Sequence, residues 1–327
     1  MPTEPRSNTL RQELFRRHPD NPILSAEQWP YLINTVFNAG ATRLANGETL
    51  LLCRCEDTAG RSHLTAARSA DGVTNWRVDE RPTFAPDVVG HPEEVWGVED
   101  PRVVWVPELE KYVIAYTCYS PSGAGVSLAT TEDFVNFERL GNIMPPEDKD
   151  ASLFPRRFNG RWALIHRPVP THGRAHMWVS YSPDLKHWGD HTITVMARRG
   201  PFWDANKIGL SSTPIETPEG WLVIYHGVKL TPAGAIYRLG LTLLDLEDPA
   251  HSILRSESWI MAPRETYERM GEVHDVVFPC GHTIGDDGDT INLYYGAADT
   301  SISLATGSIK EILAWLRENA SPGKLAE

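Results

Sequence analysis

The feature that most constrains this chain is a long series of short strand-like runs with no helical segment between them. Each run is a short apolar or alternating stretch bounded by Gly, Pro, Asn and Asp residues. The runs are Thr49–Arg54, Arg102–Val106, Tyr112–Tyr116, Trp162–His166, Met177–Tyr181, Trp221–Tyr225, Ile236–Leu244 and Ile291–Tyr295. A Rossmann fold or a TIM barrel needs a helix after most strands, so the series excludes both and predicts an all-β protein.

A weak internal repeat narrows the all-β architecture. His63–Trp76, Val126–Phe137 and Met177–Trp188 each combine a strand with Ser or Thr, a nearby Asp and an aromatic residue, and Ser301–Thr306 repeats the strand half. The copies begin roughly 50–60 residues apart, which over this chain predicts a five-bladed β-propeller with about four strands per blade. Ordinary hairpins of a β-sandwich are the alternative interpretation.

Short helices are predicted at both ends. Residues 8–17 have Asn8 as a candidate cap, and residues 308–319 begin with Ser308 and Glu311, the pattern of a capping box. We therefore divide the chain into an N-terminal extension (1–20), a propeller (21–307) and a C-terminal helix and tail (308–327). No Pro- or Ser-rich linker divides the middle part, so one circular domain is favoured over two. The N-terminal segment is a candidate contact to a second copy of the chain in a homo-oligomer.

The charge balance excludes two classes of partner. The formal net charge is −12, whereas nucleic acids and anionic membranes require a basic surface. Met1–Asp20 has no apolar signal core, and no stretch approaches the roughly 20 apolar residues that span a bilayer. We expect a cytoplasmic protein with neither partner. The four cysteines match no zinc or redox spacing, which indicates buried free thiols: Cys53, Cys55, Cys118 and Cys280.

The most distinctive local segment is Gly97–Arg102 (GVEDPR), which directly precedes an apolar run. Pro101 disfavours a helical conformation of the residue before it, so we expect an extended Asp100 at a loop-to-strand junction. Asp100 and Arg102 are two residues apart and share a strand face, whereas Glu99 points the other way. Taken alone, such an Asp–Arg pair indicates a structural salt bridge more often than a catalytic site.

Nearly the whole chain resembles glycoside hydrolase family 130, the inverting β-mannoside phosphorylases and related β-mannosidases. The resemblance rests on the number and order of short segments, none of which is diagnostic alone. They are Asn21–Leu24, Phe37–Ala41, Arg54 with Glu56, Gly97–Arg102, Lys149–Pro155, His166–Pro168, Lys207–Gly209, Tyr225–Gly227, Val276–Gly281 and Tyr294–Asp299. The family is known as a five-bladed propeller, in agreement with the repeat.

The resemblance implies a catalytic residue and a substrate-binding set. The aspartate of the Glu-Asp-Pro-Arg segment is the family's general acid, and here it is Asp100. Asn38, Arg54 and Asp299 are implied to hold the mannose unit before the scissile bond. Arg102, on the same predicted strand face as Asp100, completes the substrate-binding candidates.

The resemblance also implies a phosphate pocket built from basic and hydrogen-bonding side chains. Its candidates are Arg167, Lys207, His226, Tyr237 and Lys149. Lys149 is followed by Asp150 where some members have Arg-Asn, so this position departs from the family pattern.

These residue types favour phosphorolysis over hydrolysis. Inverting hydrolysis needs a second carboxylate to activate water, whereas phosphate is already a nucleophile and needs a cationic pocket instead. The hypothesis is attack of phosphate on the anomeric carbon of a β-mannoside, with Asp100 as general acid and α-mannose 1-phosphate as product. The co-substrate is inorganic phosphate, and we expect no cofactor and no metal.

Three alternatives remain open at this point. One is an inverting β-mannosidase of the same family that uses water. The second is a sugar-binding propeller without turnover, and the third is a five-bladed arabinan- or xylan-degrading hydrolase. The sequence does not select among β-1,4-mannosyl-glucose, β-1,4-mannooligosaccharides and β-1,2-mannobiose as substrates. The candidate acceptor-side segments are Thr171–Arg174 and Pro201–Asn206.

Overall fold

A computed structural model of the protein describes residues 13–323. Within that range the chain is all-β apart from short helices, and its strands form five antiparallel meanders in chain order. The first meander is β2 (Thr35–Arg43), β3 (Thr49–Glu56), β4 (Ser62–Ser69) and β5 (Arg77–Val78). The second is β6 (Gly97–Val106), β7 (Lys111–Ser120), β8 (Gly123–Thr131) and β9 (Phe137–Met144). The third is β10 (Asp148–Phe158), β11 (Arg161–Pro168), β12 (Met177–Ser182) and β13 (Gly189–Val195).

The last two meanders each recruit a strand from an end of the chain. The fourth is β14 (Lys207–Leu210), β15 (Ile215–Thr217), β16 (Gly220–Thr231), β17 (Gly234–Leu244) and β18 (Ser252–Ser256), with β22 (Ala320–Pro322) added at its edge. The fifth is β19 (Val277–Ile284), β20 (Thr290–Ala297) and β21 (Ser301–Ser308), with β1 (Arg16–Arg17) added. The helical elements are η2 (Ala26–Gln28), η3 (Pro92–Glu94), α1 (Thr266–Arg269) and α2 (Ile309–Asn319).

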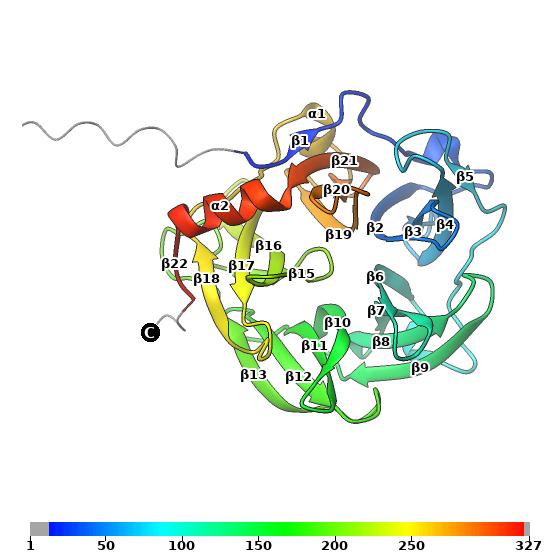
Figure 1. Ribbon diagram of the computed structural model, residues 1–327. Coiled ribbons are helices and arrows are strands. Elements are labelled where there is room, and N and C mark those ends of the chain that lie inside the picture. The colour runs from blue at the N-terminus through cyan, green and yellow to red at the C-terminus, as the bar shows by residue number, and fades with distance from the viewer. Residues whose placement is uncertain (1–12, 324–327) are drawn as a thin grey trace, which may run out of the picture.

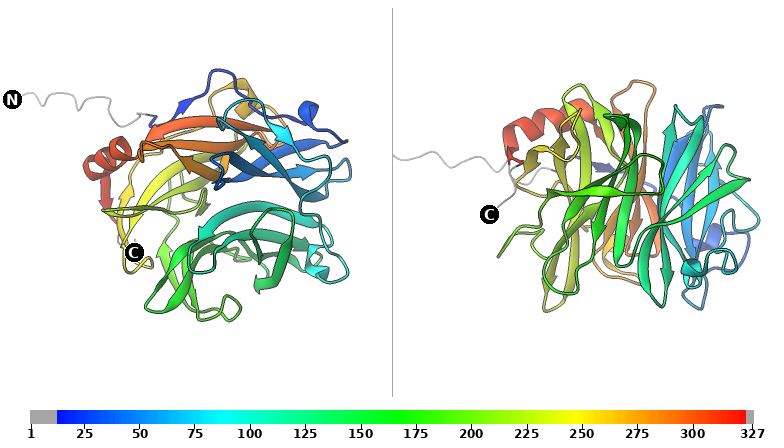
Figure 2. Two further views of the ribbon diagram at one scale, coloured as in Figure 1. Left: turned by 45° about the vertical axis from the view of Figure 1, so that its right-hand side comes forward. Right: turned by 90° about the horizontal axis from the view of Figure 1, so that it is seen from below.

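The meanders stand side by side around a common centre, with β2, β6, β10 and β19 nearest to it (Figure 1). The first two share one sheet, because Ser62 of β4 pairs in parallel with Gly97 of β6. Two further views place α2 on the outside of this arrangement (Figure 2). The central ends of the strands are therefore the place where residues from all five meanders can meet.

The core consists of apolar layers between neighbouring meanders rather than one central mass. Five large clusters of buried apolar side chains each join two meanders: first with second, second with third, third with fourth, fourth with fifth, and fifth with first. Trp221, for example, packs between the third and fourth meanders, and Tyr294 between the fifth and first. Because the series of contacts returns to its starting point, every meander is covered on both faces.

The repeat found in the sequence marks the same turn in three successive meanders. Asp71, Asp133 and Asp184 follow β4, β8 and β12, and one carboxylate oxygen of each accepts two backbone N–H groups of the turn. The preceding Ser or Thr hydroxyl bonds the same aspartate in each case. The Asp of the repeat is thus an Asx-type turn former, which explains its regular spacing.

The N-terminal helix predicted for 8–17 is wrong over its described part; residues 8–12 lie outside the described residues. Arg16 and Arg17 form β1, which pairs with β21. Phe15 is buried in the cluster between the fourth and fifth meanders, and Arg17 pairs with the fully buried Glu268. Burial of Phe15 and pairing along β21 outweigh a weak local helical preference.

The C-terminal helix is confirmed, and so is the state of the cysteines. α2 begins after Ser308, whose hydroxyl accepts the backbone N–H of Glu311, and its apolar side packs on the core through Ile312 and Leu316. All four cysteines are free and buried. No helix within residues 13–323 has the length and apolar character needed to cross a membrane.

Candidate active site

A cavity of about 340 Å³ receives side chains from all five meanders. It is lined by Asn38, Arg54, Glu99, Asp100, Tyr119, Lys149, Asp150, Arg167, Lys207, His226, Tyr237, Val273, Val276, Phe278 and Asp299. Nine of the ten predicted site residues are in this set, and Arg102 is the exception. A larger hollow of about 670 Å³ lies against β1 and the start of α2, and none of the predicted residues lines it.

The backbone delivers these side chains through a bulge that recurs in three central strands. The pairing register shifts after Phe37 in β2, after Glu99 in β6 and after Lys149 in β10. The residues at these shifts, Asn38, Asp100 and Asp150, have positive φ angles of 47°, 50° and 54°. Asn and Asp tolerate this conformation better than other side chains, and bulges of this kind re-aim side chains next to active sites.

The bulge overturns two expectations about the segment around Asp100. Asp100 is left-handed rather than extended, because the demands of the bulge outweigh the bias from Pro101. Glu99 does not point away from the site; both Glu99 and Asp100 line the cavity. The alternation of strand faces holds only for a regular strand, and an extra residue in the strand breaks it.

The Asp100 carboxylate is almost fully buried and surrounded by donors. Asn38 Nδ2 and Arg54 Nη1 each donate to Asp100 Oδ1 at 2.9 Å. Burial alone would raise the pKa of Asp100, but the positive charges of Arg54 and then Arg102 and Lys149 outweigh it and hold this pKa below its ordinary value. Without ligand, Asp100 is therefore ionised at neutral pH.

Asp299 shows the opposite shift in the same cavity. Burial raises its pKa to about 7; Arg54 opposes the rise, and the negative charges of Asp100, Glu56 and Glu99 add to it. The backbone of Asp299 also has a positive φ of 49°. Near neutral pH Asp100 is thus ionised, whereas Asp299 carries a proton much of the time. Such divergence between neighbouring acids is typical of sites for acid–base chemistry.

One wall of the cavity, from the third and fourth meanders, is basic and is organised around Asp150. Arg167 Nε donates to Asp150 Oδ2 at 2.7 Å, and His226 Nε2 lies 3.3 Å from the same oxygen. Burial would raise the pKa of Asp150, but Arg167, His226 and Arg102 hold it well below its ordinary value. Gly209 provides the space, because a Cβ there would lie 2.1 Å from Asp150 Oδ2.

His226 is neutral and has one ring nitrogen without a partner. Burial lowers its pKa against the opposing influence of Asp150. Because an ionised carboxylate only accepts hydrogen bonds, the ring proton lies on Nε2, facing Asp150. Nδ1 is buried and has no hydrogen-bond partner among residues 13–323. Lys207 Nζ lies 5.2 Å from the centre of the Tyr237 ring on the same wall.

The family can be assigned once this geometry is known. The model of glycoside hydrolase family 130, described as beta-1,4-mannooligosaccharide phosphorylase, matches residues 15–318. The chain belongs to glycoside hydrolase family 130. The matched range includes every residue that lines the cavity.

Similar proteins cover most of this family 130 chain. A β-1,2-mannobiose phosphorylase from Listeria innocua is 38% identical over 260 residues, 79% of this chain and 70% of that protein. A β-1,4-mannooligosaccharide phosphorylase from Ruminococcus albus is 30% identical over 317 residues, 95% and 93% of the two chains. The solved complex of the Listeria innocua phosphorylase with β-1,2-mannobiose has a TM-score of 0.83 at 30% identity, covering 93% of this chain and 99% of that one.

Arg102 lies behind the family 130 cavity rather than in it. Its side chain is 1% exposed, and its guanidinium donates to the backbone carbonyls of Asp100, Leu210 and Ser211 at 2.9–3.0 Å. The prediction that Arg102 binds substrate is therefore wrong: its side chain supports the backbone behind the cavity. Because the bulge turns the Asp100 side chain away, Arg102 bonds the Asp100 backbone and ties the second meander to the fourth.

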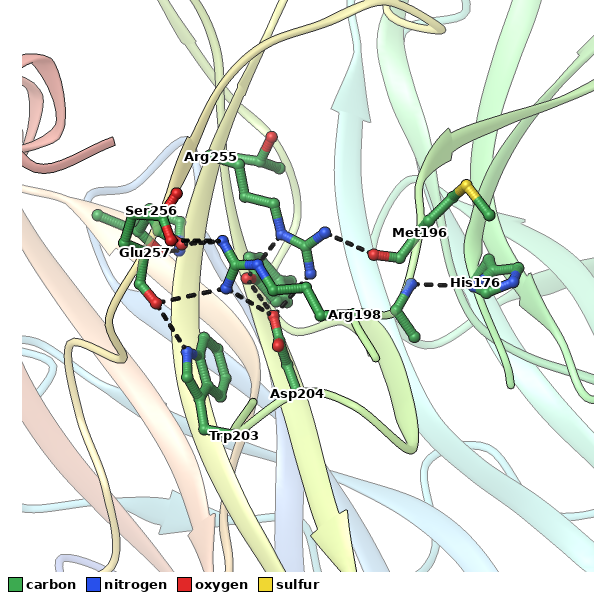
Figure 3. A network of polar contacts seen from close by, with 12 residues as sticks. His176, Met196, Arg198, Trp203, Asp204, Arg255, Ser256 and Glu257 are labelled. Atoms are coloured by element: carbon green, nitrogen blue, oxygen red, sulfur yellow. Dashed lines mark hydrogen bonds and ion pairs between the residues drawn. The ribbon is translucent and has the colours of Figure 1, made fainter. Parts of the chain in front are cut away.

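The two segments expected on the acceptor side do not line the cavity either. Arg174 donates to the backbone carbonyls of Ala197 and Arg198. In the other segment, Trp203 and Asp204 are buried in a network of polar contacts (Figure 3). This network holds the stretch of chain that leads into β14, whose first residue is Lys207.

Sequence reasoning missed several residues of the cavity. Glu99 and Asp150 were hidden by the bulges, and Tyr119 gave no signal beyond an ordinary strand residue. Phe278 lies in the segment Val276–Gly281 that carries the resemblance, but nothing in the pattern singled it out. Phe278 packs on the His226 ring at 4.5 Å between centroids. A detectable signal for Asp150 is its place in the third central strand, which matches Asn38 and Asp100 in the first two.

Proposed function

We propose that this protein catalyses the inverting phosphorolysis of β-mannosides. The observation that carries the proposal is the basic wall of Arg167, Lys207, His226 and Tyr237 in the same cavity as Asp100. Such a wall suits an oxyanion with several acceptor oxygens.

The single carboxylate of the basic wall, Asp150, supports phosphate rather than water as the nucleophile. A general base needs a pKa near the working pH to take a proton from water. Asp150 is held well below its ordinary pKa by Arg167 and His226, which makes it a weak base. Asp299 has a pKa of about 7, but it is proposed to bind the mannose unit on the Asp100 side and is not part of the basic wall. Phosphate needs no such base, because it is already ionised and nucleophilic.

In the proposed reaction, phosphate attacks the anomeric carbon and displaces the remaining sugar from the opposite face. Asp100 supplies the proton for the departing glycosidic oxygen, directly or through a sugar hydroxyl. Asp100 is ionised in the free protein, so it must gain this proton as the ligands bind. The negative charge of bound phosphate raises the pKa of a nearby carboxyl and favours this uptake. The products are α-mannose 1-phosphate and the shortened sugar.

The named activities of the relatives support this chemistry. The two proteins at 38% and 30% identity are phosphorylases of β-1,2-mannobiose and β-1,4-mannooligosaccharides. Asn38, Arg54 and Asp299, on the side of the cavity around Asp100, are the proposed ligands of the mannose unit. Lys149 Nζ lies 3.3 Å from Glu99 Oε2 and is also influenced by the charge of Asp150; from this place between Asp100 and the basic wall it is proposed to reach phosphate. No cofactor or metal takes part in the proposed reaction.

The fold and the cellular location complete the proposal. We interpret the five meanders as the blades of a five-bladed β-propeller; the cyclic series of apolar layers supports this interpretation. We also propose a cytoplasmic location. Four reduced, buried cysteines are typical of a reducing compartment, and inorganic phosphate is available there as co-substrate.

Product analysis with and without phosphate tests the function. We expect β-mannobiose to be converted to mannose 1-phosphate only when phosphate is present. Lys207→Ala is expected to raise the KM for phosphate roughly 10- to 100-fold through loss of a charge-assisted contact. Lys186→Ala, at an exposed turn, is the matched control. Release of free mannose at the same rate without phosphate would show a β-mannosidase instead and overturn the proposal.

A further inference from the structure

An exposed pair of aromatic rings stands at the edge of the cavity. The Trp96 and Tyr119 rings meet edge to face, with centroids 5.3 Å apart and planes at 66°. Trp96 is 42% exposed and Tyr119 is 37% exposed. In every other aromatic pair of residues 13–323, at least one ring is less exposed than these. A large apolar surface left open beside a binding cavity indicates a contact with a ligand.

The pair is held in place by backbone hydrogen bonds and not by hydrogen bonds of its side chains. The backbone N–H of Trp96 donates to the backbone carbonyl of Tyr119 at 2.9 Å. The next residue, Gly97, pairs with Tyr119 in the β6–β7 ladder. On the other side, Glu94 is fully buried and accepts the Tyr116 hydroxyl at 2.6 Å. No hydrogen bond within the described chain uses the Trp96 indole N–H, which leaves this donor available to a ligand.

The pair begins inside the cavity next to Asp100 and continues outside it. Tyr119 lines the cavity, whereas Trp96 does not. Lys149 Nζ lies 5.7 Å from the centre of the Tyr119 ring and also contacts Glu99, the neighbour of Asp100. A ligand that leaves the cavity on the Asp100 side therefore passes Tyr119 first and Trp96 second.

The stereochemistry of the proposed reaction decides which part of the substrate takes this path. In an inverting displacement, the nucleophile and the leaving group lie on opposite faces of the anomeric carbon. The basic wall belongs to the third and fourth meanders, while Asp100, Trp96 and Tyr119 all belong to the second meander or the segment leading into it. The leaving-group sugars therefore lie on the side of the aromatic pair.

We propose that Trp96 and Tyr119 form a binding platform for the leaving-group side of a β-mannoside oligosaccharide. Tyr119 contacts the first sugar beyond the scissile bond, and Trp96 contacts the second. The substrate class is therefore an oligosaccharide of at least three units, which gains a contact that a disaccharide lacks. This inference rests on the proposed function, because it uses the inverting geometry to orient the chain.

The test compares disaccharides and trisaccharides on Trp96 variants. The probes are mannobiose and mannotriose in both the β-1,2 and the β-1,4 series, with phosphate. For Trp96→Ala, the ratio of kcat/KM for the trisaccharide to that for the disaccharide is expected to fall about 3- to 10-fold, the range of one aromatic contact. Trp96→Phe is expected to restore most of the ratio, because it keeps an aromatic face.

The chain supplies a matched control on the same strand. Trp105 is 43% exposed and also meets a tyrosine edge to face, but it lines a different hollow at the far end of β6. Trp105→Ala is expected to leave the ratio as in the wild type. An unaltered ratio in Trp96→Ala would overturn the platform, whether both kcat/KM values stay at the wild-type level or fall by the same factor. Release of free mannose by the wild type would instead overturn the proposed function, and the trisaccharide preference would still be measurable.

Discussion

Two buried clusters in this molecule use the same types of side chain for different purposes. Around Asp204, the carboxylate Oδ2 accepts from Arg198, Arg255 and the Tyr225 hydroxyl. Other donors of the two arginines reach the backbone carbonyls of Met196, Ser256 and Glu257 (Figure 3). Arg255 Nε donates to the Tyr225 hydroxyl, and the Trp203 ring stacks on the Tyr225 ring. Around Asp100, the arginine and the carboxylates line an open cavity.

The two clusters differ in access rather than in completeness. Each has polar atoms without a partner among the described residues: Asp204 Oδ1 in one, and Asn38 Oδ1 and His226 Nδ1 in the other. Asp204 is fully covered by protein, so nothing from solvent reaches it. Asn38 and His226 line the cavity together with Arg54 and Asp100, so a ligand in the cavity can contact their side chains, although the unpartnered atoms themselves are buried. A buried ion cluster therefore indicates a reaction site only when an open space reaches it.

The largest expected effect is on catalysis at the open cluster. Asp100→Asn keeps the size of the side chain but removes the proton donor, so kcat for phosphorolysis of mannobiose is expected to fall about 10²- to 10⁴-fold. Its stability is expected to change little, because Glu56 and Glu99 still pair with Arg54. Steady-state kinetics and urea unfolding measure the two quantities. A variant that keeps more than a tenth of the wild-type kcat would remove Asp100 from its proposed role.

The closed cluster is expected to give the converse result. Asp204→Asn leaves Arg198 and Arg255 buried without their counter-charge, and the free energy of unfolding is expected to drop by about 3–5 kcal/mol. Asp190→Asn is the control, since Asp190 pairs with Arg161 at the surface and such a pair contributes about 0–1 kcal/mol. Urea unfolding of both variants decides the matter. Equal stability of the two would mean that the closed cluster is not structural.

The smallest effect concerns the pH dependence of stability. The folded-state pKa of Asp299 is raised to about 7, so between about pH 4 and pH 7 the folded protein keeps a proton that the unfolded chain releases. The contribution of Asp299 to stability is therefore lost as the pH rises through this window. Asp299→Asn cannot titrate, so between pH 5 and pH 7.5 it is expected to lose less stability than the wild type. Parallel curves for the two proteins would show that Asp299 has an ordinary pKa.

Much of the fold was predictable because it depends on local patterns. The turns after β4, β8 and β12 need Asp at one position, and α2 needs a cap at Ser308, so both leave a visible pattern. Nine of the ten predicted site residues line one cavity. They could be predicted because the resemblance identifies each of them, all but Tyr237 by the short segment in which it lies. Local patterns failed where packing decided the result, as in β1, where Phe15 is buried instead of lying on a helix.

The sequence by itself determined the strands, the turns and the chemical types of side chain available to the site. Only the tertiary structure decided which of them face the cavity, because the bulges at Asn38, Asp100 and Asp150 change the direction of side chains within a strand. It also decided the opposite pKa shifts of Asp100 and Asp299. Those shifts are sums of burial and of charges on residues far apart in the chain, and no local pattern contains such a sum.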